Sequence, residues 1–230
     1  MIPIGDDRLH NARKPILTVL FIILNVLIFI YEFRLSDEAL HNFIVTFGAT
    51  PALVVNGENW PSLLTSMFLH GGWMHLIGNM LFLWVFGDNI EAVLGHFGFV
   101  IFYLVGGLAA TASHIFADFT SEIPSVGASG AISACLGAYL VMFPHSRVRT
   151  LIPIGFFITT MRVSAWVFLG VWIIIQLVSS YLTSNTEGGG VAWWAHIGGF
   201  GFGVLAGMFF RRKAQELVVI QDDESRSRWF

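Results

Sequence analysis

Residues 125–134 have the sequence SVGASGAISA, in which Ser129 lies among small residues at the start of an apolar run. Glycines beside a serine remove Cβ bulk where a substrate backbone would have to approach, and the start of a helix offers unpaired N–H groups to an oxyanion. Small residues are also common wherever membrane helices pack closely. The stretch therefore predicts either a reactive serine or a helix contact, and the choice depends on partners for Ser129 elsewhere in the chain.

The composition indicates a protein with several membrane spans. Of its 230 residues, 55% are hydrophobic and 12% charged, and the mean hydropathy is +0.72. Ordinary soluble domains do not have this composition. The single cysteine, Cys135, excludes an intrachain disulfide. We predict an all-α polytopic membrane protein that contacts the lipid bilayer, and the net charge of −3 gives no reason to expect nucleic acid as a partner.

Apolar runs divide the chain into six predicted spans. A helix needs about 20 apolar residues to cross roughly 30 Å of hydrocarbon. The runs lie at about residues 15–33, 62–86, 96–116, 128–143, 164–182 and 192–210. Residues 1–14 are predicted to form a polar cytoplasmic lead, 15–212 a six-helix membrane domain, and 213–230 a charged, mobile tail. Span four is shorter than the hydrocarbon thickness, so we expect its first residues, Ser129 among them, to lie below the membrane surface.

Three connections between the spans have recognisable sequences. Residues 34–60 mix charged and apolar residues, which predicts an ordered external loop at the membrane interface. Residues 87–91 predict a short turn between spans two and three. Residues 151–161 are apolar but contain Pro153 and Gly155, and we place them at the inner interface.

The basic residues predict that both termini are cytoplasmic. With six spans, both termini share one side of the membrane, and eleven of the twelve Lys and Arg residues fall on that side, with only Arg34 opposite. Cytoplasmic segments of membrane proteins carry this excess of basic residues. We therefore expect a multi-pass integral membrane protein, and we place it in a bacterial cytoplasmic membrane.

His196 is the predicted partner of Ser129. Spans two, four and six all begin on the external side, so their first residues lie at comparable depth. An imidazole can take a proton from a serine and return it, although a histidine that faces a helix bundle is often only structural. Small residues recur at four-residue spacing on both spans, namely Ala195, Gly199, Gly203 and Gly207 on span six and Ser129, Ser133 and Gly137 on span four. We expect Gly199 and Gly203 to support the close helix packing that proton transfer requires.

No obvious carboxylate lies within the spans to orient His196, which predicts a Ser–His dyad rather than a triad. Asp118 and Glu122 are near enough in sequence to be candidates for this orienting role, but their loop is expected to be solvated.

His75 and Asn79 supply candidate oxyanion donors. They are four residues apart, so they share one face of a helix. Together with the backbone N–H of Ser129 they could stabilise the negative oxygen of a tetrahedral intermediate. Polar residues in membrane helices also form interhelical hydrogen bonds, so a purely structural role stays open.

Three motifs resemble those of the rhomboid intramembrane serine proteases. They are HGGWMHLIGN at residues 70–79, GASG at 127–130 and AHIGG at 195–199, followed by Gly203. Their order on spans two, four and six is similar to that of the six-span rhomboid core. The resemblance implies that Ser129 is the nucleophile and His196 the general base, with His75 and Asn79 in the oxyanion hole. It also implies an endopeptidase without cofactor or metal that cleaves single-pass or other transmembrane protein substrates near the external end of the membrane.

Two positions depart from the family pattern. Trp60 is followed by Pro61, where the family's first loop often has a Trp-Arg pair. Ser133 stands where some members place a tyrosine that stacks on the catalytic histidine. His196 must therefore be held by another contact, or less tightly.

Two other functions stay open. A non-catalytic rhomboid-like membrane chaperone would use the same fold to bind client helices, although the joint presence of all four candidate site residues argues against it. A metal or proton transporter could use His70, His75 and His196. The first two are five residues apart and lie on different faces of a regular helix, which weakens a metal chelate.

Overall fold

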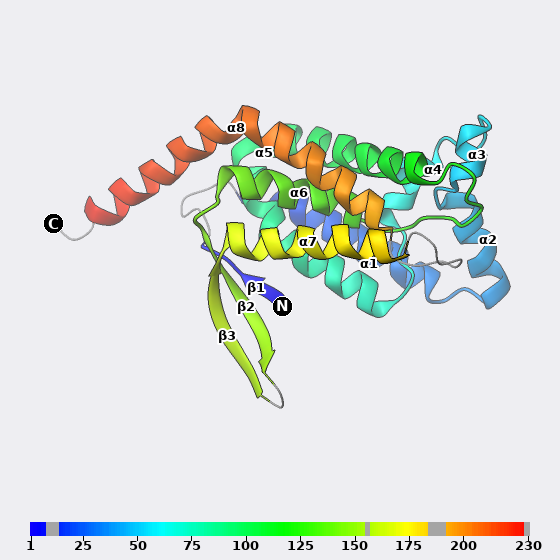
Figure 1. The fold of residues 1–230 in the computed structure, drawn as a ribbon, viewed down its shortest axis with the longest axis horizontal. Coiled ribbons are helices and arrows are strands. Elements are labelled where there is room, and N and C mark those ends of the chain that lie inside the picture. Colours follow the sequence, from blue (N-terminus) through cyan, green and yellow to red (C-terminus); the bar gives the residue numbers. More distant parts are fainter. Residues whose placement is uncertain (8–13, 155–156, 184–191, 228–230) are drawn as a thin grey trace.

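The computed structural model describes residues 1–7, 14–154, 157–183 and 192–227. The helices are α1 (Ile16–Glu32), α2 (Asp37–Phe47), α3 (Pro51–Val55), α4 (Ser62–Thr65), the 3₁₀ helix η1 (Ser66–Phe68), α5 (Trp73–Ala117), α6 (Ser129–Met142), α7 (Ala165–Thr183) and α8 (Trp193–Ser227). The strands are β1 (Ile2–Gly5), β2 (Arg147–Ile154) and β3 (Phe157–Ser164). The apolar helices α1, α5, α6, α7 and α8 form a bundle, with α2 to α4 at one end and the sheet at the other (Figure 1).

Helix α5 consists of two legs that meet at Gly95. The backbone of Gly95 has φ 75° and ψ 165°, a left-handed conformation that glycine adopts more readily than other residues. The predicted turn at residues 87–91 is wrong, because those residues continue the first leg and the break lies four residues later. The predicted start of span two is also wrong, since residues 62–68 form α4 and η1 before α5 begins at Trp73.

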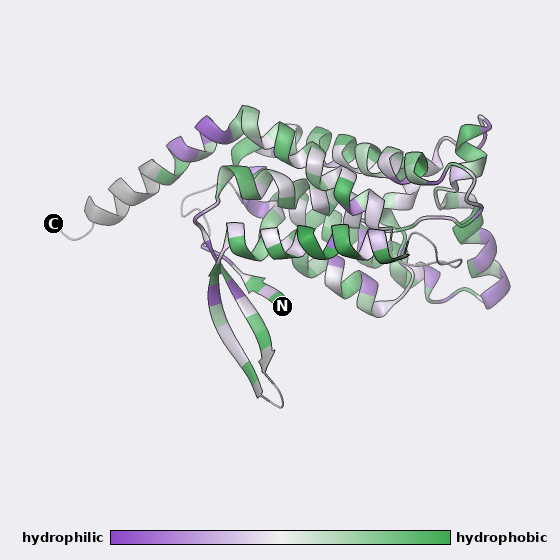
Figure 2. Cartoon of the chain, viewed as in Figure 1, coloured by the Kyte–Doolittle hydropathy of each residue, from purple (hydrophilic) through white to green (hydrophobic). Residues whose placement is uncertain are grey.

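Three of the helices are long and apolar enough to cross a membrane, and they are Trp73–Ala117, Ala165–Leu182 and Trp193–Val218. Helices α1 and α6 are shorter but also apolar. Figure 2 shows hydrophobic residues along these helices and hydrophilic ones gathered toward the two ends. Counting the two legs of α5 separately, the described part of the chain provides six apolar helical segments. The number of membrane crossings and the cytoplasmic location of both termini stay predictions.

The all-α fold class requires a correction, because the mostly helical fold includes a three-stranded antiparallel sheet in the order β1-β2-β3. Strands β2 and β3 form a hairpin whose register runs from the pair Arg147 and Ser164 to the pair Ile154 and Phe157. β-branched residues at alternate positions of β2, such as Val148 and Thr150, favour this structure. Residues 151–154 and 157–161 therefore belong to β2 and β3, and the polar lead contributes the edge strand β1 of the sheet.

Two hydrogen bonds to Asp6 attach the sheet to the helices. Asn89 Nδ2 donates to Asp6 Oδ2 at 2.7 Å, and the Tyr139 hydroxyl donates to the same oxygen. Asn89 lies in the first leg of α5, and Tyr139 lies in the last turn of α6. The sheet therefore lies at the end of the bundle where α6 finishes, opposite the end where Ser129 begins it.

Buried Glu91 of α5 binds the start of α1. The N–H groups of Leu17 and Thr18 donate to its carboxylate at 2.9 and 2.8 Å, and Thr18 Oγ1 donates at 2.7 Å. Pro15 provides no side-chain cap, so these first-turn N–H groups need another acceptor. Glu32, the last residue of α1, is also buried, with 2% of its surface exposed. The expectation that no carboxylate lies within the spans is therefore wrong at Glu32.

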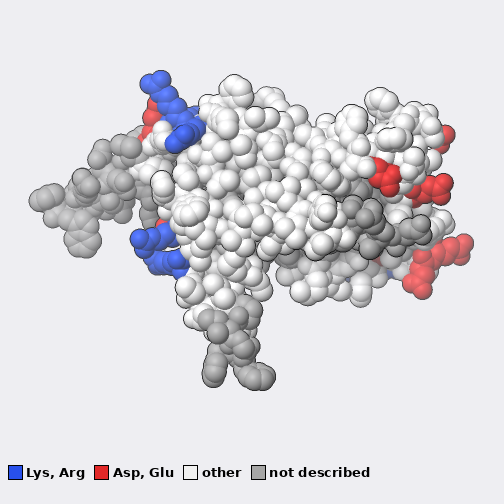
Figure 3. Space-filling view, in the orientation of Figure 1, with Lys and Arg blue, Asp and Glu red and all other residues white. Residues whose placement is uncertain are grey.

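Charge is divided between the two ends of the bundle (Figure 3). Exposed basic residues lie at the base of the hairpin and along α8 after the bundle, namely Arg147, Arg149, Arg162, Arg211, Arg212 and Lys213. Most exposed acidic residues lie at the opposite end, namely Asp37, Glu38, Glu58, Asp118 and Glu122, whereas Asp7 and Glu216 lie at the basic end and Arg34 at the acidic end. Helix α8 continues through Ser227, past the predicted end of span six, so much of the predicted tail is helical.

Candidate active site

Helices α6 and α8 touch through their backbones. A Cβ added to Gly199 would overlap the carbonyl oxygen of Gly130, and one added to Gly203 would overlap that of Ala134. Any larger residue at either position would push the helices apart. Ser129 immediately precedes Gly130, so its hydroxyl lies next to the contact between Gly130 and Gly199.

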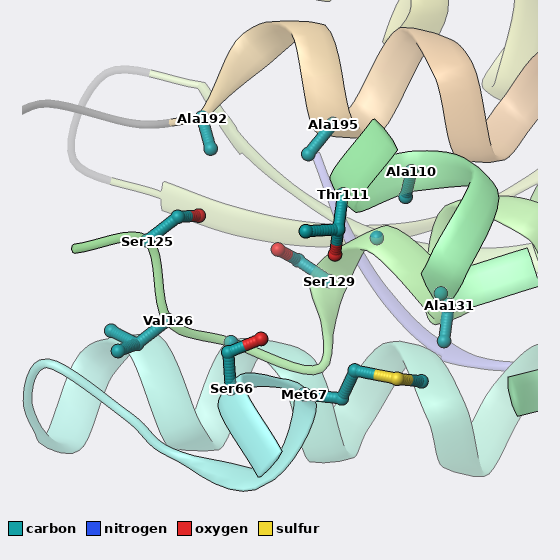
Figure 4. Close-up of a pocket in the computed structure, with 13 residues that line it drawn as sticks. Ser66, Met67, Ala110, Thr111, Ser125, Val126, Ser129, Ala131, Ala192 and Ala195 are labelled. Atoms are coloured by element: carbon teal, nitrogen blue, oxygen red, sulfur yellow. The ribbon is translucent and has the colours of Figure 1, made fainter. Parts of the chain in front are cut away.

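Ser129 is the first residue of α6, and it lines a small pocket. Figure 4 shows the side chains of Ser125, Thr111 and Ser129 pointing into a common space. Ala192 and Ala195 border this space on the side of α8, and Ser66 and Met67 border it on the other side. The N–H groups at the start of α6 have no partner within the helix, as at the start of any α-helix.

The loop before Ser129 is fixed by backbone hydrogen bonds. Ala49 and Ser125 exchange a pair of them, at 3.0 and 2.9 Å, and the N–H of Gly127 donates to the carbonyl of Ser66 at 2.9 Å. Gly127 has φ 135°, in the region that favours glycine. The GASG motif therefore requires glycine at its first position for conformational reasons.

His75 and Ser129 approach one another at Gly127. A Cβ added to Gly127 would lie 2.8 Å from His75 Nε2 and 3.5 Å from Ser129 Oγ. The histidine ring and the serine hydroxyl therefore flank the same backbone atom, and a side chain at position 127 would collide with the ring.

A hydrogen bond to His75 Nδ1 identifies the ring as a donor toward this space through Nε2. The N–H of Gly71 donates to His75 Nδ1 at 3.3 Å, so the neutral ring carries its proton on Nε2, the nitrogen near Gly127. Asn79, one turn further along α5, is 8% exposed, and its Nδ2 is buried without a hydrogen-bond partner among the described residues. An unpaired amide donor at such a position is costly unless a ligand uses it.

His196 is held by α7. Its Nδ1 lies 2.8 Å from Gln176 Oε1, and the indole of Trp172 lies with its ring centroid 5.9 Å from the imidazole centroid. Trp193 approaches the ring edge-on at 6.2 Å. Within the described part of the chain, no hydrogen bond joins His196 to Ser129, so the free nitrogen Nε2 is not engaged by the serine in this state.

Gln176 is the site residue that the sequence reasoning missed. It belongs to none of the three motifs, but it is a polar residue in an otherwise apolar run, and such residues usually face a partner inside the protein. The two acidic candidates do not take its place. Asp118 accepts hydrogen bonds from Thr120, and Glu122 is exposed, and neither is hydrogen-bonded to His196.

Metal binding gains no support from the described residues, since they include no group of three or more His, Cys, Asp or Glu side chains that could hold an ion. The imidazoles of His70 and His75 lie with their centroids 5.2 Å apart. The transporter alternative therefore has no metal chelate in the described part of the molecule.

Comparison with known proteins gives the family. The rhomboid domain model matches residues 57–213. This chain belongs to the rhomboid family. It is 36% identical over 211 residues to Rhomboid protease GluP of Bacillus subtilis (strain 168), which covers 91% of this chain and 36% of that protein. This rhomboid is also 28% identical over 181 residues to Rhomboid protein 1, mitochondrial, of Saccharomyces cerevisiae, covering 74% of this chain and 47% of that protein.

A shorter match links this rhomboid to RHOMBOID-like protein 5 of Arabidopsis thaliana, with 39% identity over 88 residues, which is 38% of this chain and 28% of that protein. The chain thus spans less than half the length of these three relatives. Family membership and the apolar helices make this rhomboid an integral membrane protein. Because its relatives include eukaryotic proteins, the bacterial membrane stays a prediction.

Proposed function

We propose that this rhomboid is an intramembrane serine endopeptidase that cleaves transmembrane segments of other membrane proteins. The observation that carries the proposal is the approach of Ser129 Oγ and His75 Nε2 to one point at Gly127. Asn79 Nδ2, which has no hydrogen-bond partner among the described residues, adds a second donor from the same helix. The name of the GluP relative, a rhomboid protease, supports the same activity.

In the proposed reaction, His196 Nε2 takes the hydroxyl proton of Ser129 as Oγ bonds to the carbonyl carbon of the substrate. The π electrons of that carbonyl move to its oxygen, which accepts hydrogen bonds from His75, Asn79 and the N–H of Ser129. The C–N bond then breaks, and the leaving amine takes the proton from His196. The same imidazole then takes a proton from a water molecule as the water oxygen bonds to the acyl carbon. The C–Oγ bond breaks, and Oγ takes that proton from His196, which restores Ser129.

The location of the site supports cleavage near the external end of a substrate helix. Ser129 opens α6 at the end of the bundle that carries the acidic residues, and the basic residues lie at the other end (Figure 3). The predicted topology has six spans with both termini and the basic residues on the cytoplasmic side. Since the pocket lies at the opposite end of the bundle, we expect it to open toward the external leaflet. Its lining includes the small residues Ala192, Ala195 and Gly127.

The test is cleavage of a model single-pass transmembrane substrate by purified protein in detergent or liposomes, beside the variants Ser129→Ala and Ser133→Ala. We expect cleavage by the wild type and by Ser133→Ala, and none by Ser129→Ala. Ser133 is a matched control, because it lies one turn along the same helix and its hydroxyl donates only to the carbonyl of Ser129, at 2.6 Å. If the wild type binds the substrate as tightly as Ser129→Ala and neither cleaves it, the protein is a non-catalytic rhomboid-like chaperone.

A further inference from the structure

Gln176 is a polar side chain buried in the apolar helix α7. Only 5% of its surface is exposed, and residues around it in the helix are almost all apolar. An amide at membrane depth is unfavourable unless its donor and its acceptor are both paired. Both are paired here, the donor within α7 and the acceptor on α8.

The two hydrogen bonds of Gln176 fix the orientation of its amide. Nε2 donates to the carbonyl oxygen of Trp172, one turn earlier in α7, at 3.2 Å. A carbonyl oxygen only accepts, so the NH₂ group must point to Trp172 and the oxygen Oε1 must point to His196. The orientation of this amide therefore follows from its partners.

This orientation determines which nitrogen of His196 carries the proton. Oε1 of Gln176 only accepts, and it lies 2.8 Å from His196 Nδ1, so Nδ1 must be the N–H donor of the pair. In the neutral ring, Nε2 is then unprotonated and has a free lone pair. A general base for Ser129 needs that lone pair.

We propose that Gln176 is a positioning residue that holds His196 in the tautomer able to accept the proton of Ser129. The role rests on the proposed function, because it matters for catalysis only if His196 is the base. Trp172 and Trp193 restrict the ring from two other directions. Contacts from α7 and from the start of α8 thus hold the imidazole in place of the tyrosine that some rhomboids have at the position of Ser133.

A neutral amide suits this position better than the aspartate of a soluble serine protease. A carboxylate buried at membrane depth carries a large desolvation cost, whereas an amide orients the ring without adding a charge. When His196 becomes protonated during the reaction, the hydrogen bond from Nδ1 to Oε1 becomes charge-assisted and stronger. The pair therefore favours the transition state over the resting state.

The kinetic test compares Gln176→Met with Gln176→Glu in the full-length protein. Methionine has similar length but no comparable acceptor, and we expect kcat to fall about 10- to 100-fold while KM for a transmembrane substrate changes little. Glutamate keeps an acceptor at the same reach and is expected to retain more activity than methionine. Ser180→Ala is the matched control, because Ser180 is buried on the same helix and donates only to the Leu177 carbonyl, at 2.9 Å.

The spectroscopic test does not depend on catalysis. In protein with ¹⁵N-labelled histidine, with His196 assigned by its loss in His196→Ala, we expect the wild-type ring at neutral pH to show a protonated Nδ1 and an unprotonated Nε2. Gln176→Met is expected to give a mixture of tautomers, and Ser180→Ala to give the wild-type signals. An unprotonated Nδ1 in the wild type overturns the proposal, and this measurement remains available if the methionine variant does not fold.

The outcomes separate this inference from the proposed function. If the wild type cleaves in a Ser129-dependent way but Gln176→Met matches it in kcat and in ring signals, the role of Gln176 is refuted and the protease stands. If the tautomer depends on Gln176 but no cleavage occurs, the hydrogen bond orients His196 as proposed and the protease assignment fails.

Discussion

Helix α8 contacts α6 and α7 in different ways, and the difference separates two requirements of the site. Toward α6 it presents Gly199 and Gly203, whose Cα atoms rest against carbonyl groups of the partner helix. Toward α7 it presents His196, which contacts the side chains of Gln176 and Trp172. Backbone atoms cannot move aside by changing rotamer as a side chain can, so the contact with α6 sets how close the helices come. The second face sets how the imidazole is turned.

The largest effect is expected on the backbone face. Gly203→Leu should abolish substrate cleavage, because the new side chain overlaps the backbone of Ala134 and forces α8 away from α6. Cleavage and thermal unfolding in detergent measure the two consequences. Gly201→Leu is the matched control, since Gly201 is exposed on the same helix and an added Cβ there meets nothing within 4 Å. Wild-type turnover in Gly203→Leu would show that close packing does not position the site.

An intermediate effect is expected at Asn79, which lies in α5 and takes part in neither the contact of α8 with α6 nor that with α7. Asn79→Ala should lower kcat roughly 10- to 1,000-fold by removing one donor to the oxyanion, with His196 still in position. The measurement is steady-state cleavage, with Ile77→Ala as control, because Ile77 lies on the same helix and is 52% exposed. A kcat equal to that of the control would remove Asn79 from the oxyanion hole.

The smallest effect is expected at Ser133. Its hydroxyl donates to the carbonyl of Ser129 within α6 and does not hold the imidazole, so Ser133→Ala should stay within about threefold of the wild-type kcat. Measuring the kinetics of Ser133→Ala and Gln176→Met side by side shows whether α6 or α7 orients His196. Equal losses in the two variants would mean that the contrast between the two faces is wrong.

Hydropathy predicted the location of most apolar helices, but not where α5 begins or how the chain connects the helices. The apolar runs predicted α6 and α7 closely, since hydrophobic length is a strong signal. The break between the legs of α5 was predicted at residues 87–91 instead of at Gly95, because Gly87 is also a glycine near polar residues and only the folded packing distinguishes the two. The hairpin was missed because apolar residues with a proline can also be read as an interfacial segment.

Two of the three motifs led to His75 and Ser129, which lie on either side of Gly127 in the structure, but the contact of His196 with α7 was not predicted. Gln176 has no motif around it, and its partner His196 lies twenty residues later on another helix. The available signal was the cost of burying an amide in an apolar span. That signal indicates an interior partner but not which one, so tertiary packing was needed to identify His196.

The central claim is that Ser129 is activated by His196, and mass spectrometry after treatment with a fluorophosphonate tests it most directly. We predict a phosphonyl adduct on Ser129 of the folded wild type, formed at least about 100-fold more slowly in His196→Ala. An adduct on a different serine, or equal rates of modification of Ser129 in the wild type and in His196→Ala, would contradict the account.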